Sequence, residues 1–102
     1  MATQDTEILE ILKTNYQQAV ALMPPDLAKE FQKKVIRADD LKGYASSISV
    51  AIQFRDETSM QRIQNWMIDN FNKHGFGKKL ADQGVDPIRI YEQLIKGIYD
   101  YR

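Results

Sequence analysis

His74 is the only histidine of the chain, so it is the first residue to consider for catalysis or metal binding. A metal site on a helix would need acidic residues three or four positions away, but the nearest ones in sequence are Asp69 and Asp82. The chain has no cysteine, which excludes thiolate catalysis and cysteine-based zinc sites. Its serines show no pattern that links one of them to His74. We therefore expect no catalytic residue, no metal and no cofactor, and we interpret His74 as an imidazole at a helix end.

Two pairs of neighbouring carboxylates, Asp39-Asp40 and Asp56-Glu57, have the residue types of an acid–base pair. Each pair stands where a helix is expected to begin. Acidic side chains are favoured there, because they accept hydrogen bonds from the free N–H groups of the first turn. We interpret both pairs as helix caps.

A basic segment with two glycines, Gly-Phe-Gly-Lys-Lys, occupies residues 75–79. It lacks the glycine spacing, the Ser or Thr after the lysine, and the preceding strand of a phosphate-binding P-loop. It predicts instead an exposed basic and aromatic loop that contacts acidic side chains or phosphates. The candidate binding residues of this loop are Lys73, His74, Phe76, Lys78 and Lys79.

A second basic surface is predicted from Lys29, Lys33 and Arg37, which recur every four residues on one side of an expected helix. Lys34 lies beside them, and Glu30 has the spacing to pair with Lys33 or Lys34. A charged outer face is typical of any amphipathic surface helix. If this face meets the 73–79 loop in space, the combined patch suits the acidic surface of another protein.

The composition indicates one ordinary globular domain over residues 1–102, with 43% hydrophobic and 27% charged residues. Fourteen basic and fourteen acidic residues cancel, which disfavours strong nonspecific binding to nucleic acid. The first seven residues hold neither a basic region nor an apolar run of signal-peptide length, and no apolar run is long enough to cross a membrane. We expect a soluble, cytoplasmic protein that does not bind membranes.

Apolar residues at helical spacing predict the elements that must position these surfaces. A first helix is expected over residues 6–23, ended by Pro24, and a second over 25–38, opened by Pro25. Thr58 and Gln61 have the spacing of a capping box that opens a further helix, with Trp66 on its inward stripe and Gly75 as its end. A short helix follows and ends at residue 83.

The segment 84–87 predicts a turn between two helices. Gly84 can adopt the left-handed conformation that ends a helix, Asp86 can cap the next one, and Pro87 fits its first position. The last helix is expected to run from Pro87 toward Tyr101. This pair resembles a helix-turn-helix in outline only, because its second helix presents charges of both signs and suits a phosphate backbone poorly.

The segment 39–54 fits two structures. As a helix, it places Leu41, Ala45 and Ile48 on one face and has Asp39 or Asp40 as its cap. As a strand, residues 46–54 alternate between apolar and small or polar residues. We favour the helix, because the sequence offers this strand hardly any partner. A strand would leave an edge that a homodimer could pair.

These observations predict an all-α bundle of four to five helices, with an α+β fold containing a strand near 46–54 as the alternative. The predicted function is a non-enzymatic protein-binding module, such as a regulator, inhibitor, immunity factor or adaptor, whose partner has an acidic surface. A nucleic-acid-binding helical protein is the alternative function.

Overall fold

The computed structural model describes residues 3–73 and 75–98. In these ranges the chain forms six α-helices, one π-helical turn and no strand. In chain order they are α1 (Thr3–Ala21), α2 (Pro25–Glu30), the π-helical turn (Phe31–Val35), α3 (Asp40–Gln53), α4 (Glu57–Asn72), α5 (Phe76–Asp82) and α6 (Pro87–Leu94). The all-α prediction is confirmed. The expected number of four to five helices is approximate, since α2, α5 and α6 have only 6, 7 and 8 residues.

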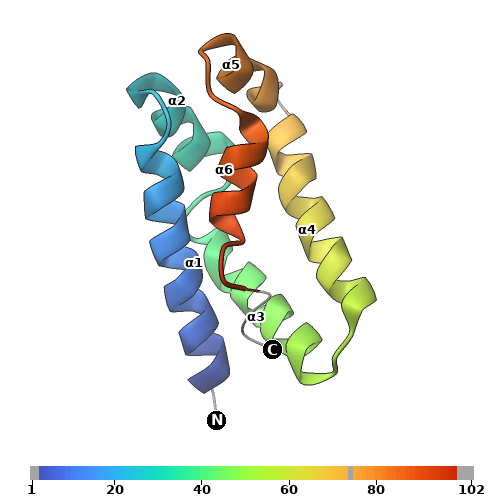
Figure 1. The fold of residues 1–102 in the computed structure, drawn as a ribbon. Coiled ribbons are helices and arrows are strands. Elements are labelled where there is room, and N and C mark those ends of the chain that lie inside the picture. Colours follow the sequence, from blue (N-terminus) through green and yellow to red (C-terminus); the bar gives the residue numbers. More distant parts are fainter. Residues whose placement is uncertain (1–2, 74, 99–102) are drawn as a thin grey trace.

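The three long helices are α1, α3 and α4, and the short helices α2, α5 and α6 pack around them (Figure 1). Helix α1 packs against α3 and α6, and α3 packs against α4. Helix α5 contacts both α4 and α6. Helix α6 comes last in the chain, yet it lies between α1 and α4 in Figure 1. The molecule measures 42 × 23 × 21 Å. No helix within the described ranges combines the length and apolar character needed to cross a membrane.

The segment 40–53 is helical, and its burial pattern shows why. Leu41, Ala45 and Ile48 recur at helical spacing and are all buried. A strand would bring Val50 and Phe54 onto one buried face, whereas 52% and 71% of these side chains are exposed. The strand alternative is therefore wrong. The strand edge that would have allowed a homodimer to pair does not occur in the described ranges.

Helix α4 begins at Glu57, two residues earlier than the capping box with Thr58 as its cap predicts. Its cap is Asp56, whose Oδ1 accepts from the Ser59 N–H at 3.0 Å and whose Oδ2 accepts from the Ser59 hydroxyl at 2.6 Å. These two bonds, the hydroxyl bond above all, hold the pKa of Asp56 below its ordinary value. Thr58 lies inside the first turn.

Trp66 does not belong to the inward stripe of α4, contrary to the prediction. The buried positions of this helix are Met60, Ile63, Met67 and Phe71. Trp66 comes directly before Met67, and one residue turns a helix by about 100°. Its side chain is therefore carried to the edge of the stripe and is 53% exposed.

The turn between α5 and α6 has the predicted form. Gly84 has a φ of 81°, Asp86 accepts from the Ile88 N–H at 3.0 Å, and Pro87 occupies the first helical position. Helix α6, however, ends at Leu94 rather than near residue 101. The amide of Asn15 on α1 donates to the Leu94 and Lys96 carbonyl oxygens at 3.0 and 2.8 Å, and so satisfies carbonyls that a longer helix would use.

The predicted helix 25–38 also stops early. After the π-helical turn, Ile36 adopts an extended conformation with its side chain buried. The hydroxyl of Tyr16 donates to the Ile36 carbonyl oxygen at 2.6 Å and replaces the bond that a continuing helix would supply. The chain thereby changes direction before α3 and exposes Arg37 at the surface.

Candidate functional site

The two basic surfaces predicted from the sequence meet in space. Lys79 on α5 reaches α2, where its Nζ lies 2.7 Å from Glu30 Oε1. Glu30 thus pairs with a residue 49 positions away and not with Lys33 or Lys34, as its spacing suggested. Around this contact an open hollow of about 620 Å³ is lined by Lys29, Lys33, Lys34 and Lys79, among others. Asp26 and Asp82 also line it.

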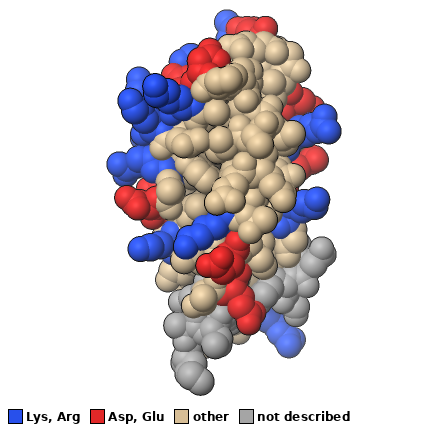
Figure 2. All heavy atoms as spheres, turned by 90° about the vertical axis from the view of Figure 1, so that its left-hand side faces the viewer, with Lys and Arg blue, Asp and Glu red and all other residues tan. Residues whose placement is uncertain are grey.

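A second hollow of about 680 Å³ adjoins the first, because Lys33 and Lys34 line both. Arg37 and Lys73 contribute the other cations of the second hollow, and Asp39 and Asp40 contribute its carboxylates. We call the cations of the two hollows the basic surface; it consists of Lys29, Lys33, Lys34, Arg37, Lys73 and Lys79. Figure 2 shows a row of basic side chains along the left-hand edge of the molecule, with acidic side chains among them and a broad uncharged region beside them; other basic side chains lie at the right-hand edge.

The cations of this surface differ in how far they are neutralised. Arg37 Nη2 lies 3.7 Å from Asp40 Oδ1, and Lys79 is paired with Glu30. Lys29, Lys33, Lys34 and Lys73 form no ion pair with any residue in the ranges 3–73 and 75–98. These four side chains are therefore available to pair with carboxylates of a partner.

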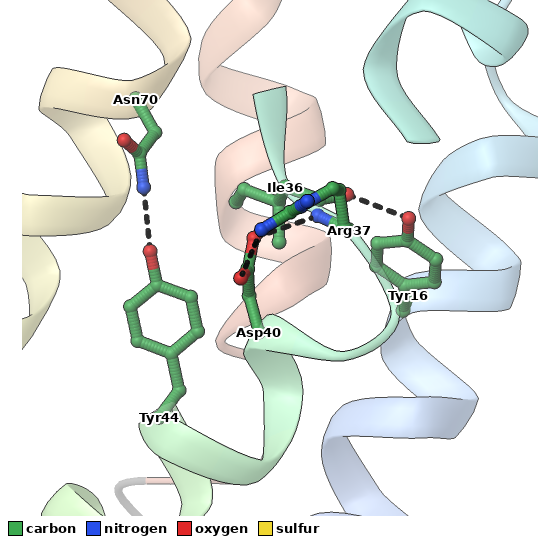
Figure 3. A network of polar contacts seen from close by, with 6 residues as sticks. All are labelled: Tyr16, Ile36, Arg37, Asp40, Tyr44 and Asn70. Carbon is green, nitrogen blue, oxygen red and sulfur yellow. Dashed lines mark hydrogen bonds and ion pairs between the residues drawn. The ribbon is translucent and has the colours of Figure 1, made fainter. Parts of the chain in front are cut away.

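A hydrogen-bond network fixes the backbone beneath the second hollow (Figure 3). Asp40 Oδ2 accepts from the Arg37 N–H at 3.0 Å, which holds the start of α3 against the end of the preceding turn. The amide of Asn70 on α4 donates to the Tyr44 hydroxyl oxygen on α3 at 2.6 Å. With the bond from Tyr16 to Ile36, the network joins α1, α3 and α4 around Arg37.

The tyrosines of this network are structural donors and acceptors. Burial, and then the charge of Asp40, raises the pKa of Tyr16 to about 12. Burial also raises the pKa of Tyr44, with Asp40 adding to it and the hydrogen bond from Asn70 opposing it. A hydroxyl with a raised pKa stays protonated at neutral pH and is a poor base.

Phe76 is not a surface residue, which corrects the prediction for the 73–79 loop. Its side chain is fully buried, and the centroid of its ring lies 5.7 Å from the ring centroid of Phe31 and 6.1 Å from that of Phe71. Gly75 takes a φ of 64°, and α5 begins at Phe76, so the expected loop is the first turn of a helix. Phe76 thus anchors α5 in the core and holds Lys79 toward α2.

The remaining predicted binding residues have different positions. Lys78 is exposed, but it is not among the residues that line either hollow. His74 lies outside the described residues. Within the described ranges, no three side chains among His, Cys, Asp and Glu come together in a metal-binding group.

Sequence reasoning missed the groove between α3 and α4, where Tyr44, Trp66 and Asn70 line the second hollow beside the cations. One signal was present, because Trp66 and Met67 are neighbours and cannot share a narrow helical stripe. The contact of α3 with α4 was not visible from spacing alone.

Comparison of the chain with protein-family models, with curated proteins and with solved structures found no match.

Proposed function

We propose that this chain is a small, soluble, non-enzymatic protein-binding module whose basic surface binds an acidic region of another protein. One observation supports it above the others. Lys33 and Lys34 come from the π-helical turn and Lys73 from the end of α4, yet all three line one hollow without an ion pair in the described ranges. In a chain with no net charge, such a gathering favours carboxylates of a partner.

A regulator, inhibitor, immunity factor or adaptor is the functional class that fits such a surface. The chain has no cysteine and so needs no oxidising compartment, and we propose that it works in the cytoplasm.

Charge reversal tests this function. The variant Lys33→Glu/Lys34→Glu/Lys73→Glu should fold normally, because all three side chains are exposed. It should lose the partners that the wild-type chain retains in an affinity purification from the source cells. The matched control is Lys13→Glu/Arg89→Glu/Lys96→Glu, which makes the same change of charge at three exposed residues outside the basic surface. Retention of every partner by the first variant would show that the basic surface binds none of them.

Nucleic acid is the second candidate, because Trp66 is half exposed beside the unpaired cations and could stack on a base. It ranks second because Asp39 and Asp40 line the same hollow and repel phosphates. Titration with a single-stranded 20-mer at low salt, read by Trp66 fluorescence, tests it. No change in fluorescence excludes this candidate, whereas binding that weakens steeply with salt supports it.

A further inference from the structure

The groove between α3 and α4 extends beyond the basic surface. A third hollow of about 340 Å³ is lined by Val50, Ile63 and Arg62, and it shares Ser47 and Trp66 with the second hollow. The two hollows thus form one groove, which follows α4 from Ser59 to Lys73. At 1.5 Å per residue, this stretch of helix is about 21 Å long.

The groove changes in chemistry along its length. Trp66, which lines both hollows, lies midway along this stretch of α4, and Val50 of α3 lines the hollow on the Ser59 side together with Arg62. Val50 and Trp66 are 52% and 53% exposed. At the Lys73 end, Lys33 and Lys73 carry unpaired charge. Tryptophan, like tyrosine and arginine, is enriched among the residues that dominate the binding energy of protein interfaces.

Small residues on α3 keep the groove open. Gly43, Ser46 and Ser47 line it, and a Cβ added at Gly43 would meet no atom within 4 Å. Glycine inside a helix costs about 1 kcal/mol relative to alanine. Because no packing contact in the described ranges requires it, close approach of another molecule is a physical reason for its presence.

We propose that this groove binds one amphipathic helix of the acidic partner, about fourteen residues long, with apolar side chains against Val50 and Trp66 and carboxylates beside Lys33 and Lys73. This inference rests on the proposed function. A helix is the expected form, because a helix fits a groove between two helices. The described backbone also offers no strand edge for an extended peptide.

A second copy of this chain fits the groove poorly. A two-fold contact places the same surface on both subunits. Lys33 and Lys73 of each copy would then face a groove in which cations outnumber the carboxylates of Asp39 and Asp40. Carboxylates on a different protein remove this repulsion.

A displayed library of 18-residue, alanine-rich helical peptides without tryptophan tests the proposal directly. One helix face of each peptide is varied among Leu, Glu, Lys and Ala, and the purified full-length chain is the target. We expect selected peptides to carry Leu in one half and Glu in the other, with Lys depleted. A synthetic selected peptide should shift the emission of Trp66, the only tryptophan, to shorter wavelength.

Three variants locate the peptide, with binding followed by the anisotropy of a labelled peptide. Gly43→Leu fills the groove and Trp66→Ala removes the apolar anchor, so each should weaken binding at least about tenfold. Ile88→Ala is the control and should leave the affinity within about threefold of wild type. Ile88 is 64% exposed and lies on α6, outside the groove.

The outcomes separate this inference from the proposed function. If Gly43→Leu and Trp66→Ala bind the acidic peptide as well as wild type while Lys33→Glu/Lys73→Glu does not, the basic surface binds partners outside the groove, and the inference is wrong. Selection of Lys-rich peptides would contradict the inference and the proposed function together. A library that yields no binder, or self-association that Gly43→Leu abolishes, would also overturn the inference.

Discussion

Replacement of Asn15 by leucine tests whether one buried amide holds the last helix in place. Asn15 is only 6% exposed, and its Nδ2 donates to the Leu94 and Lys96 carbonyl oxygens. The side chain thus joins α1 to the end of α6 across 79 residues of sequence. Leucine has the same branched arrangement of side-chain heavy atoms, with larger methyl groups and no donor, so Asn15→Leu removes both bonds without leaving a cavity.

The expected cost follows from these two bonds. Each contributes about 1 kcal/mol, and a buried carbonyl left without a donor costs about 1–3 kcal/mol. The Leu94 carbonyl bond is buried and the Lys96 carbonyl bond is partly buried, so we expect Asn15→Leu to lower the free energy of unfolding by about 2–4 kcal/mol. This is a large share of the roughly 5–15 kcal/mol that stabilises a typical domain.

Urea unfolding followed by circular dichroism measures the loss, and hydrogen exchange locates it. Amides of α6 should exchange faster in Asn15→Leu, while amides in the half of α4 that is farther from α6 keep their protection. Asn65→Leu is the control, since Asn65 is an exposed residue of α4 and should change stability by about 0.5 kcal/mol at most. A loss below about 1 kcal/mol for Asn15→Leu would refute the role of the amide.

Three further predictions concern the core and the backbone. Because burial raises the pKa of Tyr16 to about 12 from 10.0, its contribution to stability is complete below pH 10 and is lost as the pH rises toward 12. Alkaline unfolding curves should show a loss approaching about 2–3 kcal/mol that is missing in Tyr16→Phe. Phe76→Ala should cost about 3–5 kcal/mol in urea unfolding, because the ring is fully buried; a cost below 1 kcal/mol would place it at the surface. Alanine should have opposite effects at Gly43 and Gly84, where an added Cβ meets no atom within 4 Å. Thermal unfolding should show a gain of about 1 kcal/mol at Gly43, inside α3, and a loss of about 1–2 kcal/mol at Gly84, whose φ is 81°; equal signs would contradict the backbone argument.

The candidate site was only partly predictable. The sequence indicated Lys29, Lys33 and Arg37 as one surface and Lys73 and Lys79 as another, and the structure brings these two groups together. The sequence contained no sign that Phe76 is buried, because a phenylalanine between two glycines suits an exposed loop equally well. The groove beside Trp66 was missed because it requires the packing of α3 against α4.

Local chemistry determined the helices and several of their ends. Gly84, Asp86 and Pro87 act within a few residues of one another, so their order alone predicts where α5 ends and α6 begins. The apolar spacing over residues 40–53 fits a helix, but residues 46–54 also alternate like a strand, so the helix is favoured only because the sequence offers a strand hardly any partner.

Tertiary structure decided what depends on partners far away in the chain. At the end of α6, Asn15 takes the Leu94 carbonyl that a longer helix would use, and after the π-helical turn Tyr16 takes the Ile36 carbonyl. Gly97, whose φ is 82°, is a local signal for the same end of α6. Lys79 joins the basic surface because the buried ring of Phe76 fixes α5 beside α2. Spacing within a segment cannot encode such contacts, since their energy appears only when residues tens of positions apart pack together.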